Sequence, residues 1–492
     1  MVDVDRRTFV KQGLAATAGG IVLAGPMQAL VARGALGAGS LEVARNNGGY
    51  GPLVPQTDLR DGMVRLHLPH GFRYRSFTPT GSAMADGVPT PGFHDGMAAF
   101  PAGRGRIRLV RNHEVNGPGE AFGVDDRAYD PMTMGGTTTV EVDRHAESVK
   151  SWVSMNGTQL NCAGGGMPWG SWVTAEETIN GPDVTPDFTG VSNESLKQPH
   201  GFIFEVRSSW DAGEHHKGVP ILHAGRFPHE AVDVDPASGI LYETEDNFGF
   251  PSGLYRYKAP RNPMKTRRLL DGGVLEMLAI DGEPRADLTT GRHPGDTLAV
   301  RWVKINRPYP GHPDGDGTFD SLTDQDAALT FVGDQGRARG GAIFSRLEGI
   351  FYADRKIYVI STQGGDTPEG VEGPSGFGDG FGQVWVYDIA RETLTLLFES
   401  PSPDVLDMPD NMTVSPSGSL LLCEDGEPFN YLRGLNRRGQ IFDFALNAIR
   451  GGVDAEFAGA TFSPNGRTLF VNIQSENGLT LAIWGPWDKG AL

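Results

Sequence analysis

The sequence predicts an all-β fold of the β-propeller type, and three observations support this prediction. Short apolar segments alternate with turns rich in Gly, Pro, Asn and Asp, and the 492 residues include 69 Gly and 34 Pro. No long amphipathic helical pattern follows the N-terminal segment. A unit made of a turn, an apolar strand and a polar end recurs, which indicates one closed repeat domain. Strand units that close on themselves in this way are typical of a β-propeller, and we expect loop insertions between them.

The recurring unit ends in two adjacent acidic residues in three of its copies. Aligned on their strands, the copies place three pairs at the same point, namely Glu176-Glu177, Glu245-Asp246 and Glu424-Asp425. Two further copies, at residues 349–363 and 463–474, have the strand but no acidic pair. A purely structural repeat does not need these charges, so they indicate a function added to the scaffold.

Residues 161–178 combine a thiol, a glycine run and one acidic pair. Cys162 precedes three consecutive glycines, which let the backbone turn sharply, and the following strand ends at Glu176 and Glu177. Adjacent carboxylates repel one another unless a cation or a shared proton relieves them. A thiol and two carboxylates at one place therefore suit a metal ion. The alternative is a glycine turn followed by a solvated strand end, and these residues alone favour neither interpretation.

Other strand ends carry similar residues. His113 and Glu114 follow a predicted strand at residues 107–110, either as a metal ligand and its supporting partner or as part of an exposed loop. Glu230 precedes another acid-bearing copy of the repeat. The alternative for Glu230 is a turn with incidental charges.

Arg346 and Glu348 are two residues apart, which on a strand places both side chains on one face. Such a pair is commonly a plain ion pair. Beside a metal cluster, the guanidinium group can instead grip an anion through two parallel hydrogen bonds.

The composition excludes some classes of function. The formal net charge of -18 makes a nucleic-acid surface unfavourable. Two cysteines form no disulfide framework, although one bridge between Cys162 and Cys423 is possible in an oxidising compartment. Cys423 lies within an apolar run, so we interpret it as a core residue.

Residues 1–40 are predicted to be a twin-arginine (Tat) export signal. Arg6 and Arg7 precede a weakly hydrophobic stretch rich in Ala and Gly. Pro26 breaks this stretch, so we expect no stable membrane span. The protein is therefore expected in the periplasm or further outside.

Residues 41–492 then form the folded domain. Within this domain, residues 258–335 are basic at first and later rich in Gly and Asp. We interpret them as an insertion that forms loops or a lid over one face.

Six motifs follow one another along the chain after the export signal. The most specific is C-A-G-G-G-M-P-W-G-S-W-V-T-A-E-E at residues 162–177. The others are R-N-H-E at 111–114, G-R-F-P-H-E-A at 225–231, R-L-E-G at 346–349, P-D-N-M at 409–412 and L-C-E-D-G at 422–426. Together they resemble the bacterial PhoX-type alkaline phosphatases, and the Tat signal also fits that family.

The resemblance implies a six-bladed propeller that holds Ca²⁺ and Fe³⁺ at its axis and hydrolyses phosphate monoesters at alkaline pH. It implies that Cys162 is an iron ligand, that Glu177 is an iron or bridging carboxylate and that Arg346 clamps the phosphate. Further candidate metal ligands match the family motifs: His113, Glu114, Glu176, Glu230, Glu348, Asp410 and Glu424. We expect a monomer whose partners are phosphate esters and the Tat machinery.

The chemistry agrees with this expectation. Phosphoryl transfer needs positive charge around the phosphoryl oxygens, which a cluster of cations supplies. A thiolate together with carboxylates suits a mixed site, with sulfur for iron and oxygen for calcium.

Two rival functions stay open at this point. One is a secreted propeller that binds calcium without catalysis, and the other is a propeller hydrolase that uses calcium alone. Neither gives a role to both Cys162 and Arg346.

Overall fold

Strands dominate the computed structural model, which describes residues 47–492 except for 124, 148, 310–322 and 453–454. The described part holds only two α-helices, α3 (Pro263–Thr266) and α4 (Gln325–Arg337), which confirms the all-β prediction. Neither described helix is long and apolar enough to cross a membrane. The predicted Tat signal at residues 1–40 lies outside the described residues.

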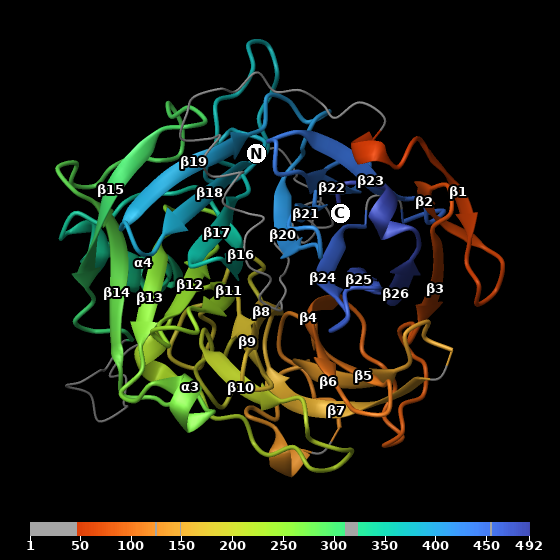
Figure 1. Cartoon of the computed structure of the whole chain (residues 1–492). Helices are drawn as coiled ribbons and strands as arrows, with labels where there is room; N and C mark the ends of the chain where they lie inside the picture. The colour runs from red at the N-terminus through yellow and green to blue at the C-terminus, as the bar shows by residue number, and fades with distance from the viewer. Residues whose placement is uncertain (1–46, 124, 148, 310–322, 453–454) are drawn as a thin grey trace.

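The first three blades follow one another along the chain, and each begins with the strand nearest the centre (Figure 1). Blade 1 consists of β4 (His94–Pro101), β5 (Ile107–His113), β6 (Gly135–Val142) and β7 (Val149–Thr158). Blade 2 consists of β8 (Asn161–Met167), β9 (Ser171–Glu176) and β10 (Ile203–Arg207). Blade 3 consists of β11 (His229–Val234), β12 (Leu241–Glu245), β13 (Leu254–Lys258) and β14 (Val274–Ile280).

The other three blades repeat this arrangement. Blade 4 consists of β16 (Leu347–Ala353), β17 (Lys356–Ser361), β18 (Gln383–Asp388) and β19 (Thr393–Glu399). Blade 5 consists of β20 (Pro409–Val414), β21 (Leu420–Glu424), β22 (Tyr431–Leu435) and β23 (Ile441–Asn447). Blade 6 begins with β24 (Phe457–Phe462), β25 (Leu469–Ile473) and β26 (Leu479–Trp484). One more strand, β15 (Thr297–Lys304), pairs with both β14 and β19 and so joins blades 3 and 4 into one sheet.

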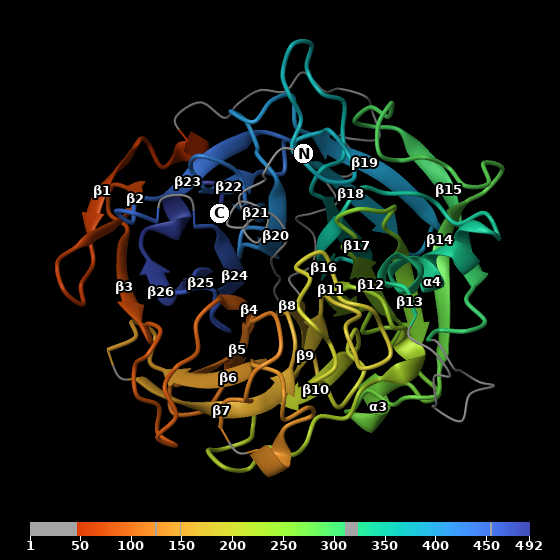
Figure 2. The same cartoon turned by 180° about the vertical axis from the view of Figure 1, so that it is seen from behind.

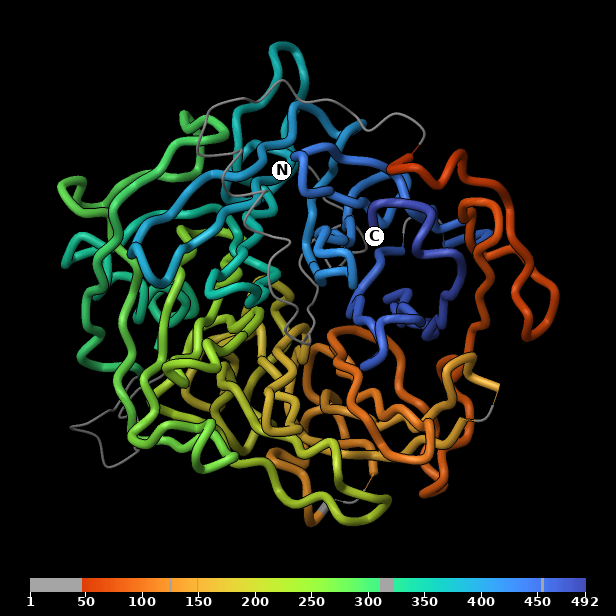
Figure 3. The backbone as a smooth tube through the Cα atoms, in the orientation of Figure 1, coloured from red at the N-terminus to blue at the C-terminus, as the bar shows by residue number. Residues whose placement is uncertain are grey.

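The innermost strands contact one another in a closed ring, in the order β4, β8, β11, β16, β20, β24 and back to β4. The chain passes once around this ring, and its first described strands lie beside its last blade (Figure 3). The described residues thus form the six-bladed propeller that the family resemblance implied.

The N-terminal strands close the ring. β3 (Arg73–Phe77) pairs with β26 and completes blade 6, while β2 (Val64–Pro69) pairs with β23 and carries β1 (Leu53–Thr57) at the edge of blade 5. Both ends of the described chain are therefore fixed in the same two sheets, which ties the stability of the last blades to the first strands.

Apolar layers between adjacent blades form the core. Between blades 4 and 5, for example, Tyr358 and Val384 pack with Met412 and Leu420. Because neighbouring blades cover both faces of a sheet, every residue of β21 is buried. Such strands have continuous apolar sequences rather than alternating ones.

The interpretation of residues 258–335 as an insertion was wrong for much of its length. β14 is the outer strand of blade 3, and β15 is a regular strand between blades 3 and 4. The basic and Gly-rich turns around these strands concealed their apolar runs. Of the described residues in this range, α4 is a helix outside the sheets that packs against blade 3, and its first residues line a pocket near the axis.

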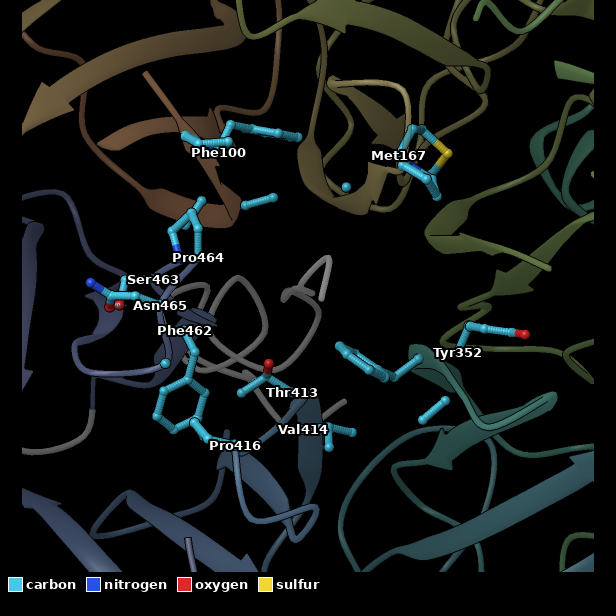
Figure 4. Close-up of a pocket in the computed structure, with 18 of the residues that line it drawn as sticks. Phe100, Met167, Tyr352, Thr413, Val414, Pro416, Phe462, Ser463, Pro464 and Asn465 are labelled. Atoms are coloured by element: carbon cyan, nitrogen blue, oxygen red, sulfur yellow. Dashed lines mark hydrogen bonds between the residues drawn. The ribbon is translucent and has the colours of Figure 1, made fainter. Parts of the chain in front are cut away.

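An apolar hollow of about 460 Å³ lies where the inner strands end. Its lining includes Phe100, Met167, Tyr352, Val414 and Phe462 (Figure 4). The inner strands surround the centre in both views along the axis (Figures 1 and 2). The acidic residues stand instead where these strands begin, so they gather at the opposite end of the axis.

Candidate metal centre

Five of the six inner strands carry an acidic or thiol side chain as their second residue. These residues are Asp95 in β4, Cys162 in β8, Glu230 in β11, Glu348 in β16 and Asp410 in β20. At each of them the strand shifts its pairing register, which marks a β-bulge. A bulge re-aims a side chain and is common beside functional sites.

The second strands of the blades supply another layer of acidic side chains. Glu177, Asp246 and Asp425 directly follow the ends of β9, β12 and β21. Successive side chains on a strand point to opposite sides. In each acidic pair, therefore, the two side chains point in opposite directions. The second residue faces the axis, and the first faces residues of its own blade and the adjoining loops.

Within the described part of the chain, three sets of ligand atoms could each hold a metal ion, with all atoms of a set within 4.8 Å of one another. The sets are Cys162 with Glu177 and Glu230, then Glu230 with Glu348 and Asp410, and finally Asp410 with Asp425 and Glu456. Glu230 and Asp410 each belong to two sets. The seven residues thus form one continuous group, which we call the axial cluster.

Several buried oxygens of the axial cluster lack hydrogen-bond donors. Glu177 Oε2, Glu230 Oε1 and Glu456 Oε2 receive no hydrogen bond from the described residues. Cys162 Sγ lies 2.9 Å from Glu230 Oε2. Because buried polar atoms are normally satisfied, these oxygens indicate positions for cations.

The electrostatics of the axial cluster lead to the same conclusion. Burial raises the pKa of every carboxyl group in the cluster, and for Glu348 it does so to about 8 although Arg346 opposes the shift. Burial and then Glu230 raise the pKa of the Cys162 thiol. Bound cations would reverse these shifts because they stabilise the ionised forms. The donor set therefore fits metal ions.

Hydrogen bonds between blades hold the bulges in place. Asn112 of blade 1 donates to the carbonyl oxygens of Cys162 at 3.0 Å and Ala163 at 2.7 Å. Thr244 of blade 3 donates to the carbonyl oxygen of Glu348 at 2.7 Å. Blade 1 thus positions a cluster residue of blade 2, and blade 3 positions one of blade 4.

Glu176 lies outside the axial cluster. Its carboxylate accepts hydrogen bonds from the backbone N–H groups of Gln159, Gly201 and Phe202 and from His200 Nδ1 at 2.6 Å. Burial alone would lower the pKa of His200, but Glu176 and Asp130 raise it to about 9. The inference that Glu176 and Glu177 share one cation was wrong, because the two side chains point apart.

Two other predicted ligands also have protein partners instead. His113 places Nδ1 2.9 Å from the Gly92 carbonyl oxygen and Nε2 2.8 Å from Thr138 Oγ1. Glu424 accepts a hydrogen bond from Arg433 Nε at 2.7 Å. Neither His113 nor Glu424 belongs to the axial cluster.

Glu114 stands at the margin of the axial cluster with Asp95. Gln474 Nε2 lies 2.7 Å from both Glu114 Oε2 and Asp95 Oδ2, and so bridges the two carboxylates. Burial raises the pKa of Glu114, and Asp95 and Glu177 add to this rise.

Sequence reasoning missed Asp95 and Glu456. Asp95 occupies the same second position of an inner strand as Cys162 and Glu230. That shared position was the signal that could have found it. Glu456 precedes β24, whose second residue, Ala458, has no ligand atom.

Arg346 is buried directly beside the axial cluster. Its Nη2 lies 2.6 Å from Asp246 Oδ2 and 2.9 Å from Glu348 Oε1. Its Nη1 has no hydrogen-bond partner among the described residues, and its φ of 42° is unusual for a residue other than glycine. A strained, buried cation with an unused donor group fits a site that binds an anion.

A pocket of about 250 Å³ gives access to this region. Glu177 and Asp246 form part of its lining, together with Phe248. The ring centroid of Phe248 lies 5.3 Å from the guanidinium carbon of Arg346. The pocket therefore borders both the axial cluster and its neighbouring cation.

Both cysteines are free, so the structure contains no bridge between them. Cys423 packs in the apolar layer between blades 5 and 6, as the sequence predicted.

Comparison with protein families gives a match that extends over most of the chain. The profile of the family described as "Alkaline phosphatase PhoX" matches residues 48–151 and 144–477. Comparison with curated proteins finds no match. Among solved structures, Pseudomonas fluorescens PhoX in complex with vanadate, a transition state analogue, has a TM-score of 0.61 and 18% identity, and the match covers 91% of this chain and 99% of that chain.

Two gluconolactonases are less similar. The XC5397 protein of Xanthomonas campestris has a TM-score of 0.38 and 13% identity, with 89% of this chain and 98% of that chain covered. The periplasmic gluconolactonase of Pseudomonas aeruginosa has a TM-score of 0.38 and 14% identity, with 90% of each chain covered.

The family profile reaches all six blades, although it ends before β26, and it includes every residue of the axial cluster. With a propeller that brings acidic residues from distant parts of the sequence to one axis, this match shows that the chain is a phosphatase and belongs to the PhoX family of alkaline phosphatases.

Proposed function

We propose that this phosphatase hydrolyses phosphate monoesters at alkaline pH and uses Fe³⁺ and Ca²⁺ ions held by the axial cluster. The observation that carries the proposal is the arrangement of buried carboxylates and one thiol, with unsatisfied oxygens, beside the buried cation of Arg346. A solvated strand edge would expose such groups, and a structural ion pair would leave no oxygen without a donor.

The donor atoms divide according to the metals they prefer. Cys162 with Glu177 and Glu230 offers sulfur and oxygen, which suits iron, whereas the sets that contain Asp410 offer oxygen only, which suits calcium. Cations bound there would withdraw electron density from the phosphoryl group and make a nucleophile available at an accessible pH. The raised pKa values of the ligands favour metal loading at alkaline pH, where protons compete less.

Arg346 binds the phosphoryl group in this proposal. Its planar donors match two oxygens of a phosphate, and phosphoryl transfer needs positive charge on these oxygens. Burial opposes its charge, but Asp246 and Glu348 outweigh this effect and raise its pKa, so it stays charged at alkaline pH. The vanadate complex of the Pseudomonas fluorescens protein supports phosphoryl transfer as the reaction.

Arg346→Gln is expected to lower kcat/KM for 4-nitrophenyl phosphate about 100-fold, because the phosphate loses a charged donor. Inhibition by inorganic phosphate should weaken as well, which steady-state kinetics measures directly. Arg433→Gln is the control, since Arg433 is also buried and paired with Glu424 but lies outside the axial cluster. Unchanged kinetics and unchanged phosphate inhibition would mean that Arg346 is only an ion-pair partner.

Cys162→Ser tests the assignment of the metals. We expect the wild-type protein to hold iron with several equivalents of calcium, and the variant to lose iron and nearly all turnover, because a serine hydroxyl is a poor iron ligand. Elemental analysis by mass spectrometry measures both metals. Cys423→Ser, a change at the other buried cysteine, should keep both metals. Calcium alone in the wild type would favour a calcium-only hydrolase, and full iron in Cys162→Ser would remove the cysteine from the ligand set.

We also propose that the protein is exported by the Tat pathway to the periplasm or beyond. The twin arginines Arg6 and Arg7 support this proposal, as does the advantage of loading metals into a folded protein before export. Cell fractionation of an Arg6→Lys, Arg7→Lys double variant tests it, and normal export of that variant would speak against the pathway.

A further inference from the structure

The pocket beside the axial cluster has an aromatic lining. Besides Glu177 and Asp246, the rings of Phe188, Phe248 and Phe250 line it. Phe188 is 65% exposed. An exposed aromatic ring at a pocket next to a reaction centre suggests a surface that a ligand covers.

The charges around this pocket are negative. Its lining, as far as the structure describes it, contains no Lys, Arg or His, whereas Asp187 and Asp326 add carboxylates. Asp187 is fixed by hydrogen bonds from Thr189 N and Asn180 Nδ2. The helix α4 begins at the pocket, but N–H groups of its first turn donate to Asp324, so the helix end does not favour an anion.

We propose that this pocket binds the alcohol part of the phosphate ester and selects an apolar alcohol that carries a positive charge, of the quaternary ammonium type. This inference rests on the proposed function. Aromatic faces attract such cations, and the carboxylates of Asp187 and Asp326 add to the attraction. An anionic alcohol would meet the same carboxylates without a compensating cation in the pocket.

The position of Arg346 fits this assignment. Its guanidinium group lies at the ring of Phe248, which lines the pocket, so phosphate held by Arg346 leaves the alcohol part next to the aromatic rings.

Three small phosphate esters test the proposal on the metal-loaded enzyme. The three differ in the charge of the alcohol part. It is a cation in phosphocholine, neutral in 3,3-dimethylbutyl phosphate, where carbon replaces the nitrogen, and an anion in phosphoglycolate. We expect kcat/KM for phosphocholine to exceed that for the neutral ester about 5-fold to 10-fold. It should exceed that for phosphoglycolate roughly 100-fold.

Substitutions then assign the effect to the pocket. Asp187→Asn combined with Asp326→Asn should bring the ratio between phosphocholine and the neutral ester close to 1 by lowering kcat/KM for phosphocholine. Phe188→Ala should lower kcat/KM for both esters, because it removes apolar contact. Asp281→Asn, at an exposed acid outside the pocket, is the matched control.

Two failures are distinguishable. Equal kcat/KM values for phosphocholine and its neutral isostere in the wild type would overturn the pocket proposal and leave the phosphatase standing. Absence of hydrolysis with every monoester, 4-nitrophenyl phosphate included, would overturn the proposed function itself.

Discussion

Glu230→Gln is expected to lower kcat for phosphate monoesters on the order of 1,000-fold or more, because a neutral amide is a far weaker ligand than a carboxylate. Glu230 belongs to two of the three sets in the axial cluster, so the variant should lose iron and calcium together. Glu230 is the second residue of β11 and stands at a β-bulge. Its strand lies between the inner strands that carry Cys162 and Glu348. Kinetics and elemental analysis on the same preparation measure both effects.

Glu243→Gln is the matched control for this prediction. Glu243 is equally buried and lies on β12, the strand paired with β11, but its carboxylate faces His229 Nδ1 at 3.3 Å and is outside the axial cluster. This variant should keep its metals and most of its turnover. If Glu230→Gln also kept full metal content and turnover, the axial cluster would not be the reaction centre.

The fold could be predicted because its signals are local. Apolar runs such as β21 and the turns before them repeat along the chain, and this repetition is visible without any tertiary information. Glu177 was found in the same way, because it stands at a fixed place in the repeat, and Glu230 was noticed because it directly precedes an acid-bearing copy. The acidic pairs therefore identified the correct end of three of the six blades.

The sequence did not show which residue of each acidic pair faces the axis. Glu176 and Glu177 have the same chemistry, and only the direction of β9 relative to the axis decides which one faces the other blades. Asp95 and Glu456 were missed for a related reason. A β-bulge and a convergence of separate blades are long-range features that leave little trace in the surrounding residues.

Removal of metal is expected to destabilise the protein more strongly as the pH rises. The metal-free cluster keeps protons that the unfolded chain releases, since the pKa of Glu348 is raised from 4.5 to about 8 by burial. A carboxyl group whose pKa is higher in the folded than in the unfolded state lowers the free energy of unfolding as the pH rises. The loss begins at the unfolded-state pKa and is complete above the folded-state pKa.

Thermal unfolding of chelated and metal-loaded protein between pH 6 and pH 9 measures this effect. The chelated form should lose at least ~10 °C in Tm across this range relative to the loaded form, because bound cations take the place of the protons. His200, whose pKa is raised to about 9, also loses stabilising charge as the pH rises, but it does so in both forms. The difference between the two forms therefore isolates the axial cluster. If the difference in Tm between the two forms stayed constant from pH 6 to pH 9, the buried carboxylates would not exchange protons for metal. That result would overturn the electrostatic argument for a metal site at the axial cluster.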